Sequence, residues 1–176
     1  MVPPGELTGG IRRGRPRLRG ENPLRQPAPQ PLQPAQPAQP PASPAKKRIL
    51  FVCIGNSCRS QMAEAFARAY GSDILAVRSA GLAPAQTVAT LTRKTLAEKN
   101  VSSDGQYPKG LESVAGDAFD IVVNLSGEPL PARPSAARSL EWRIRDPIGQ
   151  SESLYRTVAA EIENLVMRLI LELREK

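Results

Sequence analysis

The sequence contains no histidine among its 176 residues. This absence excludes the catalytic pairs and triads that use histidine as a base, and it removes the commonest metal ligand. Any proton that a reaction requires must come from Asp, Glu, Tyr, Lys or Cys. The 2 cysteines do not make a structural zinc site, which generally needs four ligands. We therefore set a metalloprotein aside, and no pattern in the chain indicates a cofactor.

Long apolar runs are also absent. No segment approaches the roughly 18 apolar residues of a membrane span. Arg12-Arg13 is not followed by the apolar stretch of a twin-arginine signal, and no secretory signal is evident. Since the 2 cysteines lie close together, a disulfide framework is not indicated. We expect a cytoplasmic location and no contact with membranes.

Residues 1–45 differ in composition from the rest of the chain. They contain 12 of the 18 prolines and no cysteine or aromatic residue, so they have little apolar surface to bury. Residues 1–48 hold 9 Lys and Arg against 2 Asp and Glu, whereas residues 49–176 hold 15 against 15. The sequence thus predicts a disordered Pro/Arg-rich tail over residues 1–45 and one domain over residues 46–176.

The tail has an arginine cluster at residues 12–19 and a Pro/Gln/Ala run at residues 26–44. No aromatic residue is interleaved with the arginines, as it usually is in single-strand binders, so we do not expect nucleic acid binding. A polyproline II spacer and an extension without a selected function are the remaining interpretations. The sequence identifies no partner for the tail.

In residues 46–176, apolar runs alternate with helical patterns. The segment at residues 48–54 is almost wholly apolar, which is typical of a central parallel strand buried on both faces. Further strands are predicted at residues 74–81, 119–125 and 139–144. Helices are predicted at residues 60–70, 87–99, 111–114 and 152–174, with Gly71 capping the first. This alternation predicts an α/β fold: a doubly wound, four-stranded parallel sheet with helices on both faces.

The loop after the first predicted strand carries the chemistry that the sequence indicates. Cys53 and Arg59 are six positions apart, and the residues between them can curl so that successive N–H groups point at one anion. The helical pattern that follows begins with free amides and a positive dipole end. A cation and a helix N-terminus both favour a reactive cysteine, so we predict a cysteine nucleophile acting on tetrahedral oxyanions. The predicted oxyanion-binding residues are Ile54, Gly55, Asn56, Ser57, Cys58, Arg59 and Ser60.

Four short segments of the chain resemble the low-molecular-weight protein tyrosine phosphatase family and its arsenate reductase relatives. They are C-I-G-N-S-C-R-S at residues 53–60, M-A-E at residues 62–64, S-A-G at residues 79–81 and D-P at residues 146–147. The resemblance covers about residues 47–174 and implies a flavodoxin-like fold.

The resemblance also implies roles for single residues. Cys53 would form a phosphocysteine, Arg59 would stabilise charge in the transition state, and Asp146 would serve as general acid and then activate water. Cys58 is either a small buried residue or a redox partner that traps the oxidised nucleophile as a disulfide. Asn56 would brace the loop in a strained turn. The supporting residue Ser79 would approach it, and Asn56, Glu64 and Ser79 match a monovalent-cation site of some relatives.

The chain departs from both branches of this family. Phosphatases usually have proline after R-S and aromatic residues after D-P, where this chain has Gln61 and Ile148-Gly149. Trp142 could line the entrance, although packing within its strand is the simpler interpretation. Arsenate reductases that are coupled to thioredoxin need two further cysteines, and this chain has none after Cys58.

Three functions are therefore consistent with the sequence. The first is a phosphomonoesterase that acts on a phosphorylated protein or a small aryl phosphate, and the intact set of Cys53, Arg59 and Asp146 favours it. The second is an arsenate reductase that uses an external thiol reductant such as glutathione or mycothiol, and the wording N-S-C-R-S-Q-M-A-E favours it. The third is a phosphate-binding module without turnover.

Overall fold

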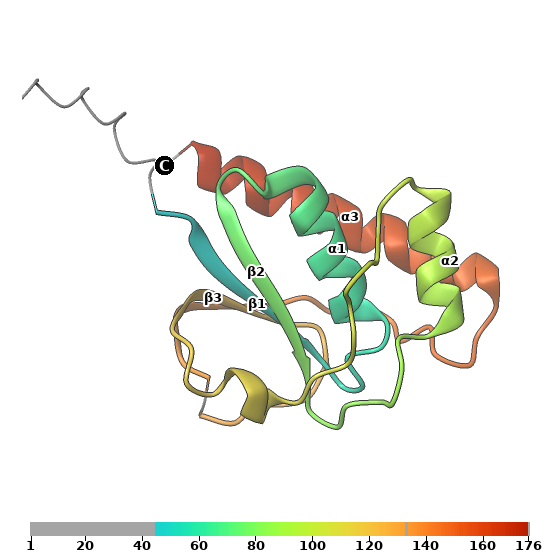
Figure 1. Ribbon diagram of the computed structural model, residues 1–176, viewed down its shortest axis with the longest axis horizontal. Coiled ribbons are helices and arrows are strands. Elements are labelled where there is room, and N and C mark those ends of the chain that lie inside the picture. Colours follow the sequence, from blue (N-terminus) through green and yellow to red (C-terminus); the bar gives the residue numbers. More distant parts are fainter. Residues whose placement is uncertain (1–44, 133, 176) are drawn as a thin grey trace, which may run out of the picture. The chain divides into compact units, whose positions relative to one another are not determined.

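The centre of the fold is a sheet of four parallel strands in the order β2-β1-β3-β4 (Figure 1). The computed structural model describes residues 45–132 and 134–175, so the predicted tail lies, apart from Ala45, outside the described residues. The strands are β1 Lys47–Cys53, β2 Leu75–Gly81, β3 Phe119–Asn124 and β4 Ala136–Glu141. The helices are α1 Arg59–Gly71, α2 Thr90–Glu98, the short 3-10 helix η1 Leu111–Val114 and α3 Glu152–Arg174.

Strand β1 occupies a central position because its side chains are apolar on both faces. Ile49, Phe51 and Cys53 belong to the main core, whereas Leu50 and Val52 belong to a second cluster on the opposite face. All five are nearly or fully buried. Burying one such aliphatic or aromatic side chain stabilises a fold by about 1.5–3 kcal/mol, so a central position is strongly favoured over an edge position. The prediction of a central strand buried on both faces is confirmed.

Helices cover the two faces unequally. Helices α1 and α3 pack against each other over one face, and α2 packs against both (Figure 1). On the opposite face, η1 and neighbouring loop residues cover a smaller cluster that includes Val114, Phe119 and Val122. The predicted α/β class and the four-stranded parallel sheet are confirmed, and among the described residues the helical cover of the second face is the short 3-10 helix η1.

Helix α3 begins and ends where the sequence predicts. Ser151 caps its N-terminus by accepting a hydrogen bond from the N–H of Leu154. The acidic Glu152 lies in the first turn and the basic Arg174 in the last turn, where each charge interacts favourably with the helix dipole. Its buried stripe includes Val158, Ile162 and other side chains of the main core. In the described part of the chain, no helix is both long and apolar enough to cross a membrane.

Two predicted elements are displaced in the structure. Strand β4 spans Ala136–Glu141 instead of residues 139–144, because its extent follows its pairing with β3, while Trp142 and Ile144 pack against the core beyond the last paired residue and extend the apolar pattern. Helix α2 begins at Thr90 instead of residue 87, because the N–H of Ala89 donates to the Ser57 carbonyl at 3.0 Å and the chain is extended there.

Gly71 is the last residue of α1 and not its cap, which is Ser72. A Cβ atom at Gly71 would lie 2.8 Å from Leu75 Cδ1 and 3.0 Å from Ile170 Cδ1. Glycine at this position therefore permits close packing of α1 on β2 and α3. The predicted capping role was wrong, because a sequence pattern does not distinguish a cap from a close contact.

Gly81 ends β2 beside the loop that follows β1. A Cβ atom here would lie 2.6 Å from the carbonyl oxygen of Ile54 and 2.9 Å from the backbone nitrogen of Asn56. We predict that Gly81→Ala lowers the free energy of unfolding by about 1–3 kcal/mol, because backbone atoms of the loop must move. Urea unfolding measures the change. Gly116→Ala is the control, since a Cβ there meets no atom within 4 Å, and equal losses in both variants would contradict this account.

Candidate active site

The loop between β1 and α1 turns its carbonyl groups away from its centre. Every carbonyl from Cys53 to Cys58 accepts a hydrogen bond from a donor outside this segment. In the order of the accepting residues, the donors are Leu82 N, Ala83 N, Ala85 N, Gln61 Nε2, Ala89 N with Thr92 Oγ1, and Met62 N. By contrast, no N–H group of residues 54–60 has an acceptor in the described part of the chain. Because peptide N–H groups require partners, this loop is suited to receive an anion.

Helix α1 begins directly after this loop, at Arg59. The side chain of the preceding residue, Cys58, caps no backbone group, and the first turn contains no acidic residue. The N–H groups of the first turn and the positive end of the helix dipole are therefore available beside the loop. Loop and helix together form the kind of site that binds phosphate-like anions.

Asn56 holds the loop in a conformation that few side chains adopt. Its φ is 45°, in the left-handed region. Its buried side chain donates to Ser60 Oγ at 2.8 Å, and its Oδ1 accepts from the backbone N–H of Lys109 at 2.8 Å and from Gln61 Nε2 at 3.1 Å. The Asn56 side chain thus links the loop to helix α1 and to the segment around Lys109.

Cys53 lies at the end of β1 and is only 2% exposed. Its sulfur is 2.9 Å from Ser60 Oγ. Since Asn56 Nδ2 already donates to that oxygen, the hydroxyl proton of Ser60 is free to donate to the sulfur. The sulfur therefore has the donor that a thiolate nucleophile needs.

The guanidinium of Arg59 is buried and held at one end. Nη1 donates to the carbonyl oxygens of Leu125 at 2.7 Å and Ile144 at 3.3 Å. Nη2 donates to Asp146 Oδ2 at 2.6 Å. One N–H on Nε and one on Nη2 have no acceptor among the described residues. These two groups are available to donate to the oxygens of an anion.

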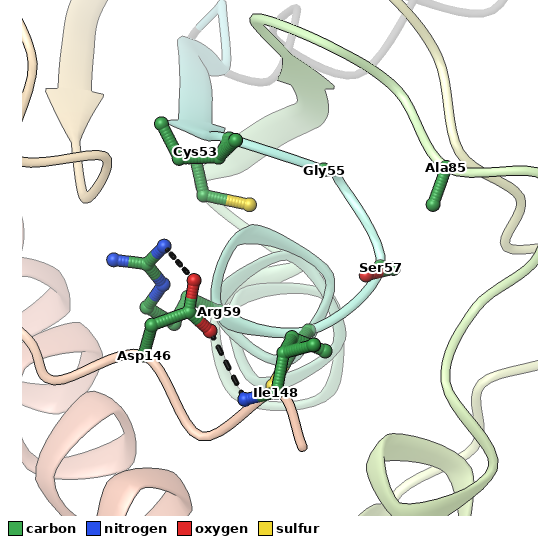
Figure 2. Close-up of a pocket in the computed structure, with 9 residues that line it drawn as sticks. Cys53, Gly55, Ser57, Arg59, Ala85, Asp146 and Ile148 are labelled. Carbon is green, nitrogen blue, oxygen red and sulfur yellow. Dashed lines mark hydrogen bonds and ion pairs between the residues drawn. The ribbon is translucent and has the colours of Figure 1, made fainter.

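These side chains meet in one pocket of about 210 Å³. Figure 2 shows Cys53, Arg59 and Asp146 around its centre, with Ala85 on the opposite side. Asp146 Oδ1 also accepts from the N–H of Ile148 at 3.1 Å, so both carboxylate oxygens are held in place. The lining residues are Cys53, Ile54, Gly55, Ser57, Cys58, Arg59, Ala85, Asp146 and Ile148.

Some of the predicted oxyanion-binding residues line the pocket, and others are buried below it. Most of them line the pocket, but the side chains of Asn56 and Ser60 lie beneath it with no exposed surface. Both side chains support the loop through the hydrogen bonds to each other and to Cys53. Their predicted contact with the anion could therefore come only from their backbone N–H groups.

Two further predicted residues lie away from the pocket. The hydroxyl of Ser79 donates to the Glu64 carboxylate on α1, and it makes no hydrogen bond to the loop within the part of the chain that the structure describes. Trp142 packs beside Phe51, with ring centroids 5.8 Å apart, and does not line the pocket. Among the described residues, no group of three or more His, Cys, Asp or Glu side chains could hold a metal ion.

Several supporting residues were missed because their contacts come from distant segments. Gln61 Nε2 donates to the carbonyls of Asn56 and Tyr107, at 2.9 Å each, and Gln106 Nε2 donates to the Gln61 carbonyl at 3.0 Å. One signal for this role was present in the sequence, since Gln61 stands where phosphatases of the family usually have proline. In the structure, this glutamine connects the loop to residues 106–107.

Cys58 is buried and differs from Cys53 in its surroundings. Burial raises the pKa of the Cys58 thiol to about 12, and the negative charge of Cys53 acts in the same direction, against a hydrogen bond with Thr92. Near neutral pH the Cys58 sulfur is therefore a protonated thiol, which is a poor nucleophile.

A family model matches most of this chain. The model for low molecular weight phosphotyrosine protein phosphatases matches residues 48–176. The chain belongs to this family. The predicted resemblance is confirmed, and it extends over all the elements that build the pocket.

Named relatives within the family have different activities. The glutaredoxin arsenate reductase of Synechocystis sp. is 35% identical over 127 residues, which are 70% of this chain and 96% of that protein. A solved arsenate reductase in its phosphate-binding state has 34% identity and a TM-score of 0.66, covering 72% of this chain and 98% of its own. The arginine phosphatase from Geobacillus stearothermophilus has 26% identity and a TM-score of 0.64, covering 73% and 94%. Family membership alone does not distinguish the two activities.

Asn56 and Asn100 allow a matched test of the loop, because both have positive φ, 45° and 56°. Glycine removes backbone strain at either position. At Asn56 it also removes the buried hydrogen bonds to Ser60 and Lys109. We predict that Asn56→Gly lowers the free energy of unfolding by about 1–3 kcal/mol and slows alkylation of Cys53. Asn100→Gly should be neutral or slightly stabilising, and equal effects in the two variants would refute the bracing role of the Asn56 side chain.

Proposed function

We propose that this protein reduces arsenate to arsenite, with Cys53 as nucleophile and an external thiol as reductant. The observation that carries the proposal is a pocket of about 210 Å³ that is lined by Cys53 and has no aromatic side chain among its described lining residues, which suits a small tetrahedral anion better than a phosphotyrosine ring. The sequence alone favoured phosphate ester hydrolysis. The arsenate reductases among the relatives reverse that order, because they match the chain at 33–37% identity while the arginine phosphatase matches at 26%.

The pocket suits a small tetrahedral anion. Its volume of about 210 Å³ is below the range of about 300–1,000 Å³ that is usual for larger organic ligands. Its lining residues Ala85 and Ile148 are aliphatic, and none of the described residues that line it is aromatic. A phosphotyrosine ring would therefore have no aromatic surface to stack on. Arsenate needs only the loop N–H groups and the N–H groups of Arg59 that have no acceptor among the described residues.

The first step joins Cys53 to arsenic. The sulfur attacks As(V), a sulfur–arsenic bond forms, and one oxygen leaves as water after receiving a proton, for which Asp146 is the candidate donor. Arg59 and the loop N–H groups hold the remaining oxygens and stabilise their charge. In this role Asp146 is well placed, since it lines the same pocket as Cys53 and is bonded to Arg59.

The second step requires a thiol from outside the chain. Its sulfur attacks Cys53 Sγ, the sulfur–arsenic bond breaks, and arsenic keeps the electron pair and leaves as arsenite. The product on the protein is a mixed disulfide, and a second thiol then releases Cys53 and forms the external disulfide. Overall, one arsenate and two thiols give one arsenite, one disulfide and one water.

Cys58 is a poor substitute for the external thiol. Its pKa, raised to about 12 by burial, keeps it protonated where an attacking thiolate is needed. No cysteine follows it in the chain, so a disulfide formed there could not be passed to the surface by a third cysteine. The relative from Synechocystis sp., which is named a glutaredoxin arsenate reductase, supports a glutathione-type reductant.

Phosphate ester hydrolysis is the second candidate, and Asp146 favours it. A general acid beside the nucleophile would protonate the leaving oxygen of an ester and then activate water against a phosphocysteine. The fold likeness to an arginine phosphatase at 26% identity is consistent with this chemistry. The third candidate, binding of phosphate without turnover, predicts neither product.

The decisive assay measures arsenite and inorganic phosphate side by side. With arsenate, glutathione and glutaredoxin, we predict that the unaltered protein forms arsenite, that Cys53→Ser reduces this to background, and that Cys58→Ser keeps most of it. Asp146→Asn should lower the rate by about 10²–10⁴-fold. Mycothiol and thioredoxin systems serve as alternative reductants. Release of phosphate from an aryl phosphate, without arsenite from any of these thiols, would refute arsenate reduction and support the second candidate.

A further inference from the structure

A buried carboxylate lies beneath the active-site loop. Glu64, on α1, is 1% exposed and accepts hydrogen bonds from Ser79 and from Arg68. The ammonium group of Lys109 is 3.8 Å from Glu64 Oε2, and the Lys109 side chain is only 8% exposed. A buried carboxylate without compensating charge is costly, so these three donors account for its presence here.

The candidate monovalent-cation site of Asn56, Glu64 and Ser79 does not fit a free ion in this chain. The Asn56 Oδ1 atom already accepts from Lys109 N and Gln61 Nε2. Ser79 directs its hydroxyl proton at Glu64, and so presents a donor toward the carboxylate. Two of the three candidate oxygen ligands, Asn56 Oδ1 and the Glu64 carboxylate, are therefore engaged by the protein's own donors, and Ser79 uses its proton on Glu64.

The Lys109 ammonium is surrounded by groups of the kind that bind a potassium ion. Besides the Glu64 carboxylate, it lies 3.0 Å from the Tyr107 carbonyl oxygen and 4.7 Å from the centroid of the Tyr107 ring. Carboxylate, carbonyl and an aromatic face all attract a cation. Burial lowers the pKa of Lys109, and the neighbouring Glu64 carboxylate opposes that shift.

We propose that Lys109 is a positioning residue whose ammonium takes the place of a monovalent cation, so that the loop needs no added potassium. Its backbone connects this cation to the nucleophile. The N–H of Lys109 donates to Asn56, Asn56 donates to Ser60, and Ser60 contacts the Cys53 sulfur, in steps of 2.8, 2.8 and 2.9 Å. The Lys109 carbonyl also accepts from the N–H of Gly81 at 2.7 Å.

The inference is independent of whether arsenate or a phosphate ester is the substrate, because it concerns the loop before any substrate binds. Two measurements on the full-length protein report on it: the midpoint of thermal unfolding and the rate of Cys53 alkylation by iodoacetamide. Each is compared in potassium chloride and in choline chloride at equal ionic strength, since choline is too bulky to enter a buried site. For the unaltered protein we expect no difference between the salts. A potassium-dependent rise in either quantity would overturn the proposal.

Substitution of Lys109 should create a response to potassium. Lys109→Ala leaves Glu64 without the ammonium and opens space, so in choline we expect a lower midpoint and several-fold slower alkylation, with potassium restoring most of both. Lys109→Arg keeps the charge and should behave as the unaltered protein does. Adding Glu64→Gln to Lys109→Ala should abolish the potassium response.

A folded Lys109→Ala protein with unchanged alkylation and no potassium response would overturn the proposal, as would a response that survives Glu64→Gln. If Lys109→Ala does not fold in either salt, Lys109→Met replaces it, since this variant keeps the length of the side chain without the charge. We then expect slower alkylation in Lys109→Met than in Lys109→Arg, and equal rates would contradict the role of the charge.

Discussion

The site depends on the direction of the peptide groups between Cys53 and Cys58. Their carbonyls are all bound by donors from the β2–α2 connection and from α1, while the N–H groups of residues 54–60 have no acceptor in the described part of the chain. The left-handed turn at Asn56 and the missing Cβ at Gly81 make this orientation possible. The proposed anion binding is therefore local in origin, which agrees with equal numbers of acidic and basic residues, 15 each, in residues 49–176.

Local patterns in the sequence were sufficient to locate the loop that contains Cys53 and Arg59 and the elements around it. The apolar segment of β1 and the capped, periodic α3 could be placed because their signals lie within the elements themselves. The network of Gln61, Gln106 and Lys109 could not be predicted, because its hydrogen bonds join side chains to backbone groups that are 45 and 53 positions away and that no periodicity connects. Strand β4 was misplaced for a similar reason, since its end is set by pairing with β3.

Buried polar side chains under the pocket connect the residues that support the loop to Cys53. Asn56 joins the loop to Lys109, and Lys109 joins it to the buried Glu64 and, through Gly81, to β2. Above this layer lie Cys53, Arg59 and Asp146, which both proposed reactions would use. The 2 cysteines and the aliphatic lining residues Ala85 and Ile148 are the features from which we infer the substrate.

The most direct test of the central claim is to follow backbone amide resonances while arsenate or phosphate is added to the unaltered protein. If the loop binds the anion through its N–H groups, the amide protons of residues 54–60 and the Nε proton of Arg59 will shift downfield together, with one dissociation constant. Amides of exposed surface segments, such as residues 102–105, will not shift. Shifts confined to other parts of the chain, or none at a concentration that protects Cys53 from alkylation, would contradict the account.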